Sequence, residues 1–393
     1  MVKKKIMVVT PRFPYPVIGG DRLRIFEVCR ELSRHYELHL YSLCANAEEM
    51  NISVPQDGVF AKVHRFLQVK SRSYISTLCA IPTQRPLQVA YYENAALKTA
   101  VESDAKHFDA CLGHLIRVAD YLTPLKIPKI LEMTDAISMN YERVKHDVNW
   151  LSLKSIIYAF EFNRLNNYEK KQKDKFNLLN FISEVDAKYL FGCIPKNVVV
   201  SNNGVDLSQY KFSRAGRVKK TIVFVGNMNS LQNADACGFF AKEVLPKLRA
   251  LDPEIKFRVV GRMDQDFIER YHAMPGVELM PNVLSVEQAV ADAMIGVASI
   301  RYGAGVQNKV LEYMALGLPS IISDVAAEGL SVRDQYDCLV ARTVDDYVRA
   351  VMAILKSPEL ADNIARQGLS YVTKHHAWNE VLAPLIQRVR QLV

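Results

Sequence analysis

The chain has 393 residues, of which 49% are hydrophobic and 23% are charged, and its formal net charge at pH 7 is +8. This length exceeds what one hydrophobic core usually supports, so we expect two globular domains, and the ordinary composition excludes a disordered or low-complexity chain. The positive charge favours an anionic partner, which could be a nucleotide, a lipid phosphate or a nucleic acid.

The sequence carries no signal for a membrane span, for export or for a metal site. No apolar run approaches the roughly 18 residues of a membrane span, and the segment 1–10 turns polar too soon for a signal peptide. The seven cysteines form no Cys-x-x-Cys pair, and no two histidines stand at ligand spacing. We therefore expect a cytoplasmic protein with reduced thiols, without a metal and without any other cofactor.

The first half of the chain alternates predicted strands and helices. A helix is expected at 21–35, and Ser183 and Gly192 mark the start and the end of a later helix. Buried strands are expected at 5–10, 37–43, 110–112, 129–133, 178–182 and 198–201. The polar, basic stretch that follows has the composition of a linker, so we predict an N-terminal domain at 1–206 and a linker at 207–220.

The second half repeats this alternation. Ser285, followed three residues later by Gln288, forms a capping box that predicts a helix start. Strands are expected at 221–225, 256–260, 277–280, 295–299 and 319–322. We predict a C-terminal domain at 221–375 and a last helix at 376–393 that packs back on the first domain. The predicted fold class is α/β, with two Rossmann-like domains whose parallel sheets face a central cleft.

Residues 299–319 combine the end of a buried strand, a small-residue turn and an amphipathic helix. Apolar residues recur at helical spacing from Val306 until a Gly-x-Pro sequence ends the helix. Gly303 and Gly305 are expected at the helix start, where unpartnered N–H groups and the helix dipole bind phosphate. Glu312 lies roughly 10 Å further along the helix, a distance that suits ribose hydroxyls. One helix would then hold both ends of a nucleotide sugar; the alternative is a buried α/β unit with a glycine turn and a solvated glutamate.

A further glycine turn follows the first strand of each predicted domain. The loop 10–22 contains Arg12 and ends in Gly19 and Gly20 at a helix start, so it is expected to close over a phosphate or an acceptor. Gly226 occupies the equivalent place in the second domain. Neither turn has the Gly-x-Gly-x-x-Gly pattern and the sequence has no P-loop, which disfavours dinucleotide oxidoreductases and P-loop enzymes.

These motifs together resemble the glycosyltransferases of the GT-B type in the large retaining family 4. The resemblance is greatest to the sugar transferases associated with PEP-CTERM and exopolysaccharide gene clusters. It covers nearly the whole chain and is most specific in the block 305–315. Its other motifs are Pro14 through Arg24, Glu161-x-x-Arg164-Leu165, Tyr168-Glu169, Ser183-Glu184, Asn203-Gly204-Val205-Asp206, and Val225-Gly226 with Asn233.

The chain departs from the family pattern at two places. Many members carry two glutamates separated by seven residues, and Ala304 stands where the first would precede Glu312. The usual Arg and Lys after the first strand of the second domain are replaced by Asn227 and Met228. Recognition of the donor sugar is then left to backbone groups, Gln307 and Asn308. The charge that neutralises the diphosphate is left to Arg262, Arg301 or Lys309.

The resemblance implies a retaining transferase that needs no metal. Such an enzyme moves a hexose from a nucleoside diphosphate sugar to a hydroxyl of a saccharide or lipid-linked acceptor, in the synthesis of cell-surface polysaccharide or glycolipid. The helix start and its cations stabilise the departing diphosphate. The leaving phosphate takes the proton of the acceptor, and no protein nucleophile is evident.

Each candidate residue also has a plainer interpretation. His114 resembles the family's histidine that contacts the donor sugar, but a lone histidine is often structural. Arg301 follows a strand end, where binding residues collect, or forms a domain-interface ion pair. Asp135 orients an acceptor hydroxyl or caps the helix from 137 onward, and Lys309 binds the diphosphate or is a surface lysine. We assign catalysis to His114, Lys309 and Arg301, acceptor binding to Arg12 and Asp135, and donor binding to Gly19, Gly20, Gly226, Arg262, Gly303, Gly305, Val306, Gln307, Asn308 and Glu312.

The expected partners are a nucleotide-sugar donor and a saccharide or lipid-linked acceptor. The segment 69–78 mixes basic and aromatic residues, so it either touches the inner membrane surface or is a solvated loop. No nucleic-acid-binding module is recognisable, and nucleic acid is not an expected partner. Two alternatives remain open from the sequence: a nucleotide-sugar epimerase of the same fold and a non-catalytic nucleotide-sugar-binding subunit.

Overall fold

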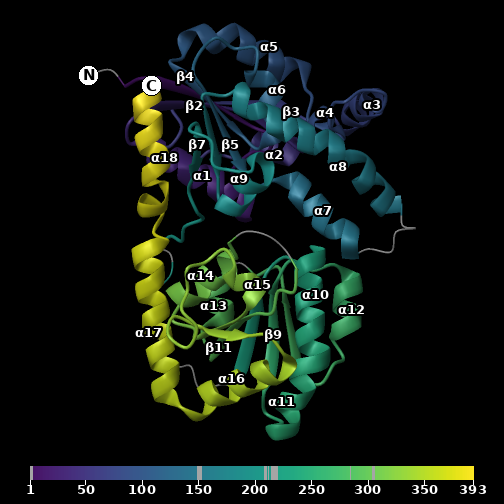
Figure 1. Cartoon of the computed structure of the whole chain (residues 1–393), viewed down its shortest axis with the longest axis vertical. Helices are drawn as coiled ribbons and strands as arrows, with labels where there is room; N and C mark the ends of the chain where they lie inside the picture. The colour runs from purple at the N-terminus through teal and green to yellow at the C-terminus, as the bar shows by residue number, and fades with distance from the viewer. Residues whose placement is uncertain are drawn as a thin grey trace. The chain divides into compact units, whose positions relative to one another are not determined.

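A computed structural model of the chain describes residues 3–147, 153–207, 210, 212–213, 220–283, 285–302 and 306–393. The chain forms two compact units, the first containing Met1–Asn202 with Leu382–Val393 and the second containing Asn203–Val381. Each unit is built on its own parallel sheet (Figure 1). The predicted α/β class with two Rossmann-like domains is therefore confirmed.

The first unit holds a seven-stranded parallel sheet in the order β3-β2-β1-β4-β5-β6-β7. The strands are β1 (Lys5–Thr10), β2 (Glu37–Cys44), β3 (Lys62–Leu67), β4 (Ala110–His114), β5 (Lys129–Thr134), β6 (Leu178–Phe181) and β7 (Val198–Val200). The central strands are almost wholly buried because helices cover both faces of a parallel sheet. The strand order reverses between β1 and β4, and ligands of such sheets bind beyond the carboxyl ends of the strands at that point.

Helices surround this sheet (Figure 1). The α-helices are α1 (Gly20–Ser33), α2 (Ala47–Asn51), α3 (Lys70–Ala80), α4 (Leu87–Tyr91), α5 (Ala95–Asp104), α6 (Ala119–Leu122), α7 (Ile137–Asp147), α8 (Leu153–Lys171) and α9 (Glu184–Phe191), and the 3-10 turns are η1 (Ala105–His107), η2 (Ile116–Val118) and η3 (Gln172–Asp174). Ser183 caps α9 by accepting a hydrogen bond from the Val185 amide at 3.0 Å. Gly192 follows α9 with a left-handed φ of 75°, so both predicted ends of that helix are confirmed.

The second unit holds a six-stranded parallel sheet in the order β10-β9-β8-β11-β12-β13. The strands are β8 (Thr221–Val225), β9 (Lys256–Gly261), β10 (Val277–Pro281), β11 (Ile295–Ala298), β12 (Ser320–Ser323) and β13 (Leu339–Ala341). The helices that follow β8 in the chain are α10 (Leu231–Phe239), η4 (Phe240–Val244), α11 (Leu245–Leu251), α12 (Gln265–Tyr271), α13 (Val286–Val290), α14 (Asn308–Ala315), α15 (Asp324–Ala327), α16 (Val344–Lys356), α17 (Pro358–His375) and α18 (Trp378–Leu392). The strand order reverses between β8 and β11, which creates a second switch point.

The core of the second unit lies on both faces of its sheet. Ile222 and Phe224 of β8 pack into one buried cluster, and Val223 and Val225 pack into another. This follows from the strand repeat, which sends successive side chains to opposite faces.

The C-terminal residues of α18 belong to the first unit. Arg388 donates a hydrogen bond to the Lys196 carbonyl at 2.7 Å, and Arg390 contacts the ring of His35. The sheet of the first unit also includes β3, which the sequence did not predict. This edge strand mixes charged and apolar residues and is only partly buried, so it lacks the apolar run that identifies its neighbours.

Candidate functional site

The helix that was expected to begin at Gly303 and Gly305 begins later. These two glycines and Ala304 lie outside the described residues. α14 starts at Asn308, and Gln307 precedes it with an extended backbone, at ψ 98°, and without a side-chain capping bond. The predicted start is therefore wrong by several residues. Glu312 lies four residues after Asn308, roughly 6 Å along the helix axis.

α14 is held against the sheet at the second switch point. The Tyr313 hydroxyl accepts a hydrogen bond from the Val225 amide at 2.7 Å and donates one to the Val297 carbonyl at 3.3 Å. A Cβ on Gly296 would lie 2.4 Å from the Tyr313 ring, so only glycine in β11 allows the helix to approach this closely. These contacts place the first turn of α14 beside the carboxyl ends of β8 and β11.

Lys309 and Glu312 are both partly buried on α14. The Lys309 ammonium donates to the amide oxygens of Asn233 at 3.0 Å and Gln307 at 3.2 Å, and it lies 5.0 Å from the centre of the Phe224 ring. Burial lowers the pKa of Lys309 to about 8, and the same cause raises the pKa of Glu312 to about 7, with Lys309 opposing that shift. Near neutral pH both groups are therefore close to losing their charges.

The turns after β8 and β9 touch through glycine. Gly261 has a φ of 129°, and a Cβ there would lie 2.0 Å from the Gly226 carbonyl oxygen. The Gly226 amide donates to the Val260 carbonyl at 3.0 Å. Arg262 follows directly and its side chain is exposed. The predicted donor residues Gly226 and Arg262 thus lie side by side on two turns at the carboxyl edge of the sheet.

Arg301 also follows this edge, but its charge is already paired. Its guanidinium forms a bidentate salt bridge with Asp235 of α10 and lies 5.2 Å from the centre of the Phe239 ring. Both partners belong to the second unit, so this ion pair lies within one domain.

A network that the sequence did not predict positions Asn308 at the start of α14. The Asn203 amide donates to Asn308 Oδ1 at 3.0 Å. The Asn203 carbonyl contacts His376 Nδ1 at 2.9 Å, and the Val205 amide donates to the His376 carbonyl at 2.7 Å. A Cβ on Gly204 would lie 2.6 Å from the Trp378 ring. The motif at 203–206 therefore links the start of α14 to the segment between α17 and α18.

His114 ends β4 at the switch point of the first unit. It is buried, and neither ring nitrogen makes a well-formed hydrogen bond to the described residues. Burial lowers its pKa to about 3, while the charge and the nearby backbone of Asp21 oppose this shift. The imidazole is therefore neutral at physiological pH, with one donor and one acceptor that the described protein groups do not use.

The turn after β1 lies close to His114. α1 begins at Gly20, and Gly19 precedes it with a φ of 98°. Arg12 forms a salt bridge with Asp21 at 2.9 Å. The pKa of Asp21 is lowered: burial raises it, but the charge of Arg12 and the hydrogen bonds from Arg12 and the Arg22 amide oppose and outweigh that effect. Arg12 and the two glycines thus form the rim of the site next to the imidazole.

Asp135 does not cap α7. The amides at the start of that helix donate elsewhere: Ala136 donates to Asp186 at 2.8 Å and Ile137 donates to Glu169 at 2.9 Å. Asp135 instead accepts a hydrogen bond from the Asn140 side chain at 2.9 Å, and burial raises its pKa. The capping alternative for Asp135 is therefore wrong.

A cavity of about 340 Å³ lies at the carboxyl ends of the first three strands; we call it the β1–β3 cavity. Gln68 donates from its side chain to Ser73 at 2.5 Å and to the Tyr91 carbonyl at 2.7 Å, but its own amide oxygen has no partner among the described residues. An unpaired buried acceptor is costly unless a ligand or water satisfies it. The lining residues are Pro11, Arg12, Arg22, Ala45, Glu49, Gln68, Lys70, Tyr91 and Tyr92.

No group of three or more His, Cys, Asp or Glu side chains among the described residues is arranged to hold a metal ion. None of the helices described has both the length and the apolar character that crossing a membrane requires.

Residues 219–357, about a third of the chain, match the protein family described as Glycosyl transferases group 1. This segment contains Gly226, Arg262, Arg301, Lys309 and Glu312. Glycosyltransferase 1 domain-containing protein 1 of Xenopus tropicalis is 20% identical over 145 residues, which are 35% of this chain and 42% of that relative. The match thus spans less than half of the relative's length.

Solved structures resemble the chain over nearly its whole length. HepE of Anabaena, in complex with UDP and glucose, is 12% identical with a TM-score of 0.70, covering 98% of this chain and 99% of its own. Sucrose-phosphate synthase of Thermosynechococcus elongatus is 14% identical with a TM-score of 0.71, covering 99% of each chain. At these identities the likeness establishes the fold, a GT-B arrangement of two Rossmann-like domains. The roles assigned to single residues stay predictions.

Proposed function

We propose that the protein is a glycosyltransferase that moves a hexose from a nucleoside diphosphate sugar to a hydroxyl of a saccharide or lipid-linked acceptor, with retention of the anomeric configuration. The observation that carries this proposal is the position of Lys309 and Glu312 on α14, inside the segment that matches the glycosyl transferase family. The UDP in the HepE complex supports a uridine nucleotide as donor. We further propose that the enzyme is cytoplasmic, that it acts in the synthesis of cell-surface polysaccharide or glycolipid, and that it is similar to the PEP-CTERM-associated transferases.

The donor nucleotide is assigned to the carboxyl edge of the second sheet. The Lys309 ammonium is hydrogen-bonded to two neutral amide oxygens. A bound diphosphate would supply the negative charge that these two partners do not. Binding an anion raises the pKa of Lys309 above its value of about 8 and keeps the group charged. Arg262 adds a second cation from the neighbouring turn. The Glu312 carboxylate accepts hydrogen bonds from the ribose hydroxyls, which favour its ionised form.

The acceptor is assigned to the first unit. The β1–β3 cavity offers the unpaired Gln68 oxygen and the Arg12 guanidinium to an acceptor with hydroxyl or anionic groups. His114 offers a neutral imidazole that hydrogen-bonds a hydroxyl of the transferred hexose. Asp135, with a raised pKa, is assigned to orient the acceptor hydroxyl.

In the reaction the bond between the anomeric carbon and the diphosphate oxygen breaks, and the acceptor oxygen bonds to the same face of the sugar. The acceptor proton passes to an oxygen of the leaving diphosphate. Lys309, Arg262 and the start of α14 stabilise the negative charge that develops on that diphosphate. We propose that these groups take the place of a metal ion.

A thermal-unfolding screen with UDP, GDP, ADP and CMP tests the donor assignment. A nucleotide that binds the folded chain at a hundred times its Kd raises the free energy of unfolding by about 2.7 kcal/mol, and we expect this for one nucleoside diphosphate. If none raises the melting temperature, the donor assignment is wrong. NMR of the anomeric proton in the product then tests retention, and conversion of a nucleotide sugar without any acceptor would identify an epimerase instead. Tight nucleotide binding without turnover on a confirmed acceptor would identify a non-catalytic subunit.

A further inference from the structure

α3 carries its large apolar side chains on its solvent side. Its buried residues are the small Ser73 and Ala80, whereas Tyr74, Ile75 and Leu78 are at least 60% exposed. A helix of a globular domain normally buries its apolar face and exposes its polar one. In α3 the large apolar side chains are exposed instead. The segment 69–78, for which the sequence allows either a membrane contact or a solvated loop, lies mostly in α3 and carries an exposed apolar face.

The exposed apolar surface extends beyond α3. Thirteen large apolar side chains are exposed among the described residues, and seven of them gather here. We call this group the α3 patch: Leu67, Val69, Tyr74, Ile75, Leu78, Ile81 and Phe160. Phe160 comes from α8, where Arg164 lies 4.0 Å from its ring centre and donates to the Ala80 carbonyl at 3.2 Å. Exposed apolar surfaces that are continuous in this way mark interaction sites.

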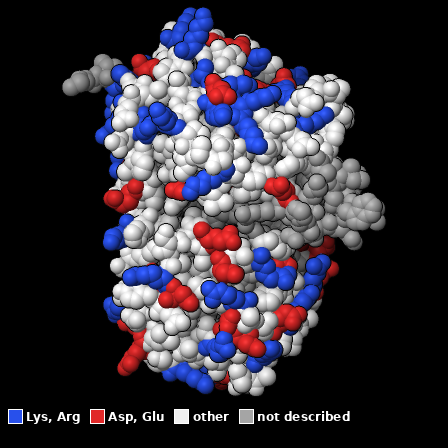
Figure 2. Space-filling view, in the orientation of Figure 1, with Lys and Arg blue, Asp and Glu red and all other residues white. Residues whose placement is uncertain are grey.

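Positive charge borders the α3 patch. With 100° between successive residues, Lys70 and Arg72 lie on the two sides of the arc that holds the exposed apolar residues of α3. α3 contains no acidic residue. Over most of the face drawn in Figure 2 basic and acidic side chains are interspersed, whereas the region of α3 at the upper right is mainly uncharged with basic side chains.

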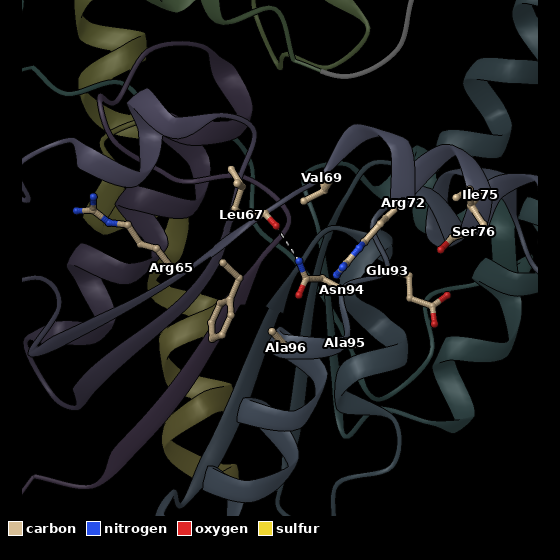
Figure 3. Close-up of a pocket in the computed structure, with 11 residues that line it drawn as sticks. Arg65, Leu67, Val69, Arg72, Ile75, Ser76, Glu93, Asn94, Ala95 and Ala96 are labelled. Carbon is tan, nitrogen blue, oxygen red and sulfur yellow. Dashed lines mark hydrogen bonds between the residues drawn. The ribbon is translucent and has the colours of Figure 1, made fainter.

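A cavity of about 540 Å³ opens beside the patch (Figure 3). Leu67, Val69 and Ile75 line it together with the basic residues Arg65 and Arg72. The cavity also contains Glu93, whose carboxylate forms a salt bridge with Arg85 at 2.5 Å. Its lining thus joins apolar surface to the positive charge of Arg72, because the Arg65 guanidinium is turned away (Figure 3), toward the carbonyls of Met50 and Ile52.

We propose that the α3 patch binds a membrane surface that carries anionic lipids. The apolar side chains enter the interfacial layer, while Lys70 and Arg72 contact the headgroup phosphates. A helix with an apolar face and basic flanks is the pattern of helices that lie in the plane of a membrane interface. Both charges that flank the apolar arc of α3 are positive, and the nearby Glu93 carboxylate is already paired with Arg85. This favours an anionic bilayer over a protein partner, whose interface would need matched charges of both signs.

The patch is continuous with the proposed acceptor site. Leu67 and Val69 line the 540 Å³ cavity, and the alternate residues Gln68 and Lys70 line the β1–β3 cavity. A lipid-linked acceptor could therefore reach the β1–β3 cavity while its lipid stays in the bilayer. This consequence rests on the proposed function, whereas lipid binding by the patch does not.

Flotation of the full chain with lipid vesicles tests the proposal. We expect the protein to float with vesicles of phosphatidylcholine and phosphatidylglycerol and to float much less with phosphatidylcholine alone or at high salt. Each basic side chain contributes roughly fivefold to binding of an anionic surface, so Lys70→Gln with Arg72→Gln should weaken binding roughly 25-fold. Leu78→Ser should weaken it roughly tenfold.

Matched controls come from the second unit. Leu251→Ser removes an apolar side chain that is 62% exposed, and Arg342→Gln removes an exposed charge; neither should change flotation. Leu78→Trp should show blue-shifted fluorescence and quenching by brominated lipids on anionic vesicles. Wild-type protein that floats no better than Leu78→Ser overturns the proposal. So does a monomer–dimer equilibrium that the α3 variants shift without any vesicle binding, since the patch would then bind a second copy.

Discussion

Replacing Glu312 with glutamine should stabilise the free protein at about pH 8 and weaken its binding of nucleotide. Burial raises the pKa of Glu312 from its ordinary value of 4.5 to about 7, although the charge of Lys309 opposes the shift. Between these two values the folded chain binds more protons than the unfolded chain, so the free energy of unfolding falls as the pH rises through them. Above about pH 7 the fold holds an ionised, partly buried carboxylate, and glutamine removes that unfavourable charge.

The size of the effect follows from the two pKa values. The difference between 4.5 and about 7 corresponds to at most about 3 kcal/mol. Because the side chain is partly exposed, solvent reduces this value, and we expect a gain of about 1–3 kcal/mol at about pH 8. Near pH 4 the carboxyl is mostly neutral in both states, so the variant and the wild type should be about equally stable there.

Urea unfolding at a series of pH values measures the stability effect, and titration calorimetry with UDP measures binding. The glutamine variant loses a charged acceptor for the ribose hydroxyls, so its Kd should rise about tenfold to a hundredfold. Glu328→Gln, at an exposed position of the same unit, is the matched control and should change neither quantity. A Glu312→Gln protein that is less stable than wild type at about pH 8, or that binds UDP equally well, would refute the reasoning.

Substitutions of Lys309, Gly261 and His114 give three further predictions. Affinity for UDP should fall as the pH rises from about 7 to about 9, because burial lowers the pKa of Lys309 to about 8 and the neutral amine no longer attracts diphosphate; Lys309→Met should bind weakly and lose this dependence in calorimetry. Gly261→Ala should destabilise the fold by more than about 3 kcal/mol in urea unfolding, because its Cβ would lie 2.0 Å from the Gly226 carbonyl oxygen. Gly192→Ala is the control: it has open space around it and should cost only about 1–2 kcal/mol. His114→Leu should be as stable as wild type or about 1 kcal/mol more stable, because two unpaired buried nitrogens are removed. Its turnover should fall at least tenfold. Marked destabilisation would instead show that His114 has a structural role.

Most of the strands that the sequence predicted are buried on both faces, although the partly buried edge strand β10 was predicted as well. β1, β8 and β11 read as nearly continuous apolar runs because helices cover both sides of a parallel sheet. β3 and β13 were not predicted: both are partly buried edge strands, β3 mixes charged and apolar residues, and β13 is only three residues long. An apolar run of four or more residues identified a strand, whereas a mixed or very short strand left no such signal.

The positions of the candidate residues followed from strand ends, but their partners did not. In a parallel sheet all carboxyl ends lie on one edge, so residues after β4, β8, β9 and β11 could be placed there from the sequence alone. The partners come from distant segments: Asp235 pairs with Arg301 across 66 residues, and Asn203 reaches Asn308 across 105 residues. The helix start at Asn308 was missed because the extended backbone at Gln307 has no residue signature.

Lys309 and Arg301 occupy similar places in the sequence, but their electrostatic surroundings differ. Asp235 neutralises Arg301 through two hydrogen bonds, and the Arg301 side chain is 51% exposed, so an anion that bound it would compete with a carboxylate and with water. Lys309 is partly buried against a ring, and its ammonium is held by amide oxygens that carry no formal charge. A buried cation without a bonded carboxylate gains more from an added diphosphate than a paired, exposed one does. Of the two predicted cations, Lys309 is therefore the stronger candidate for the diphosphate, and the contribution of Arg301 is to hold α10 against the end of β11.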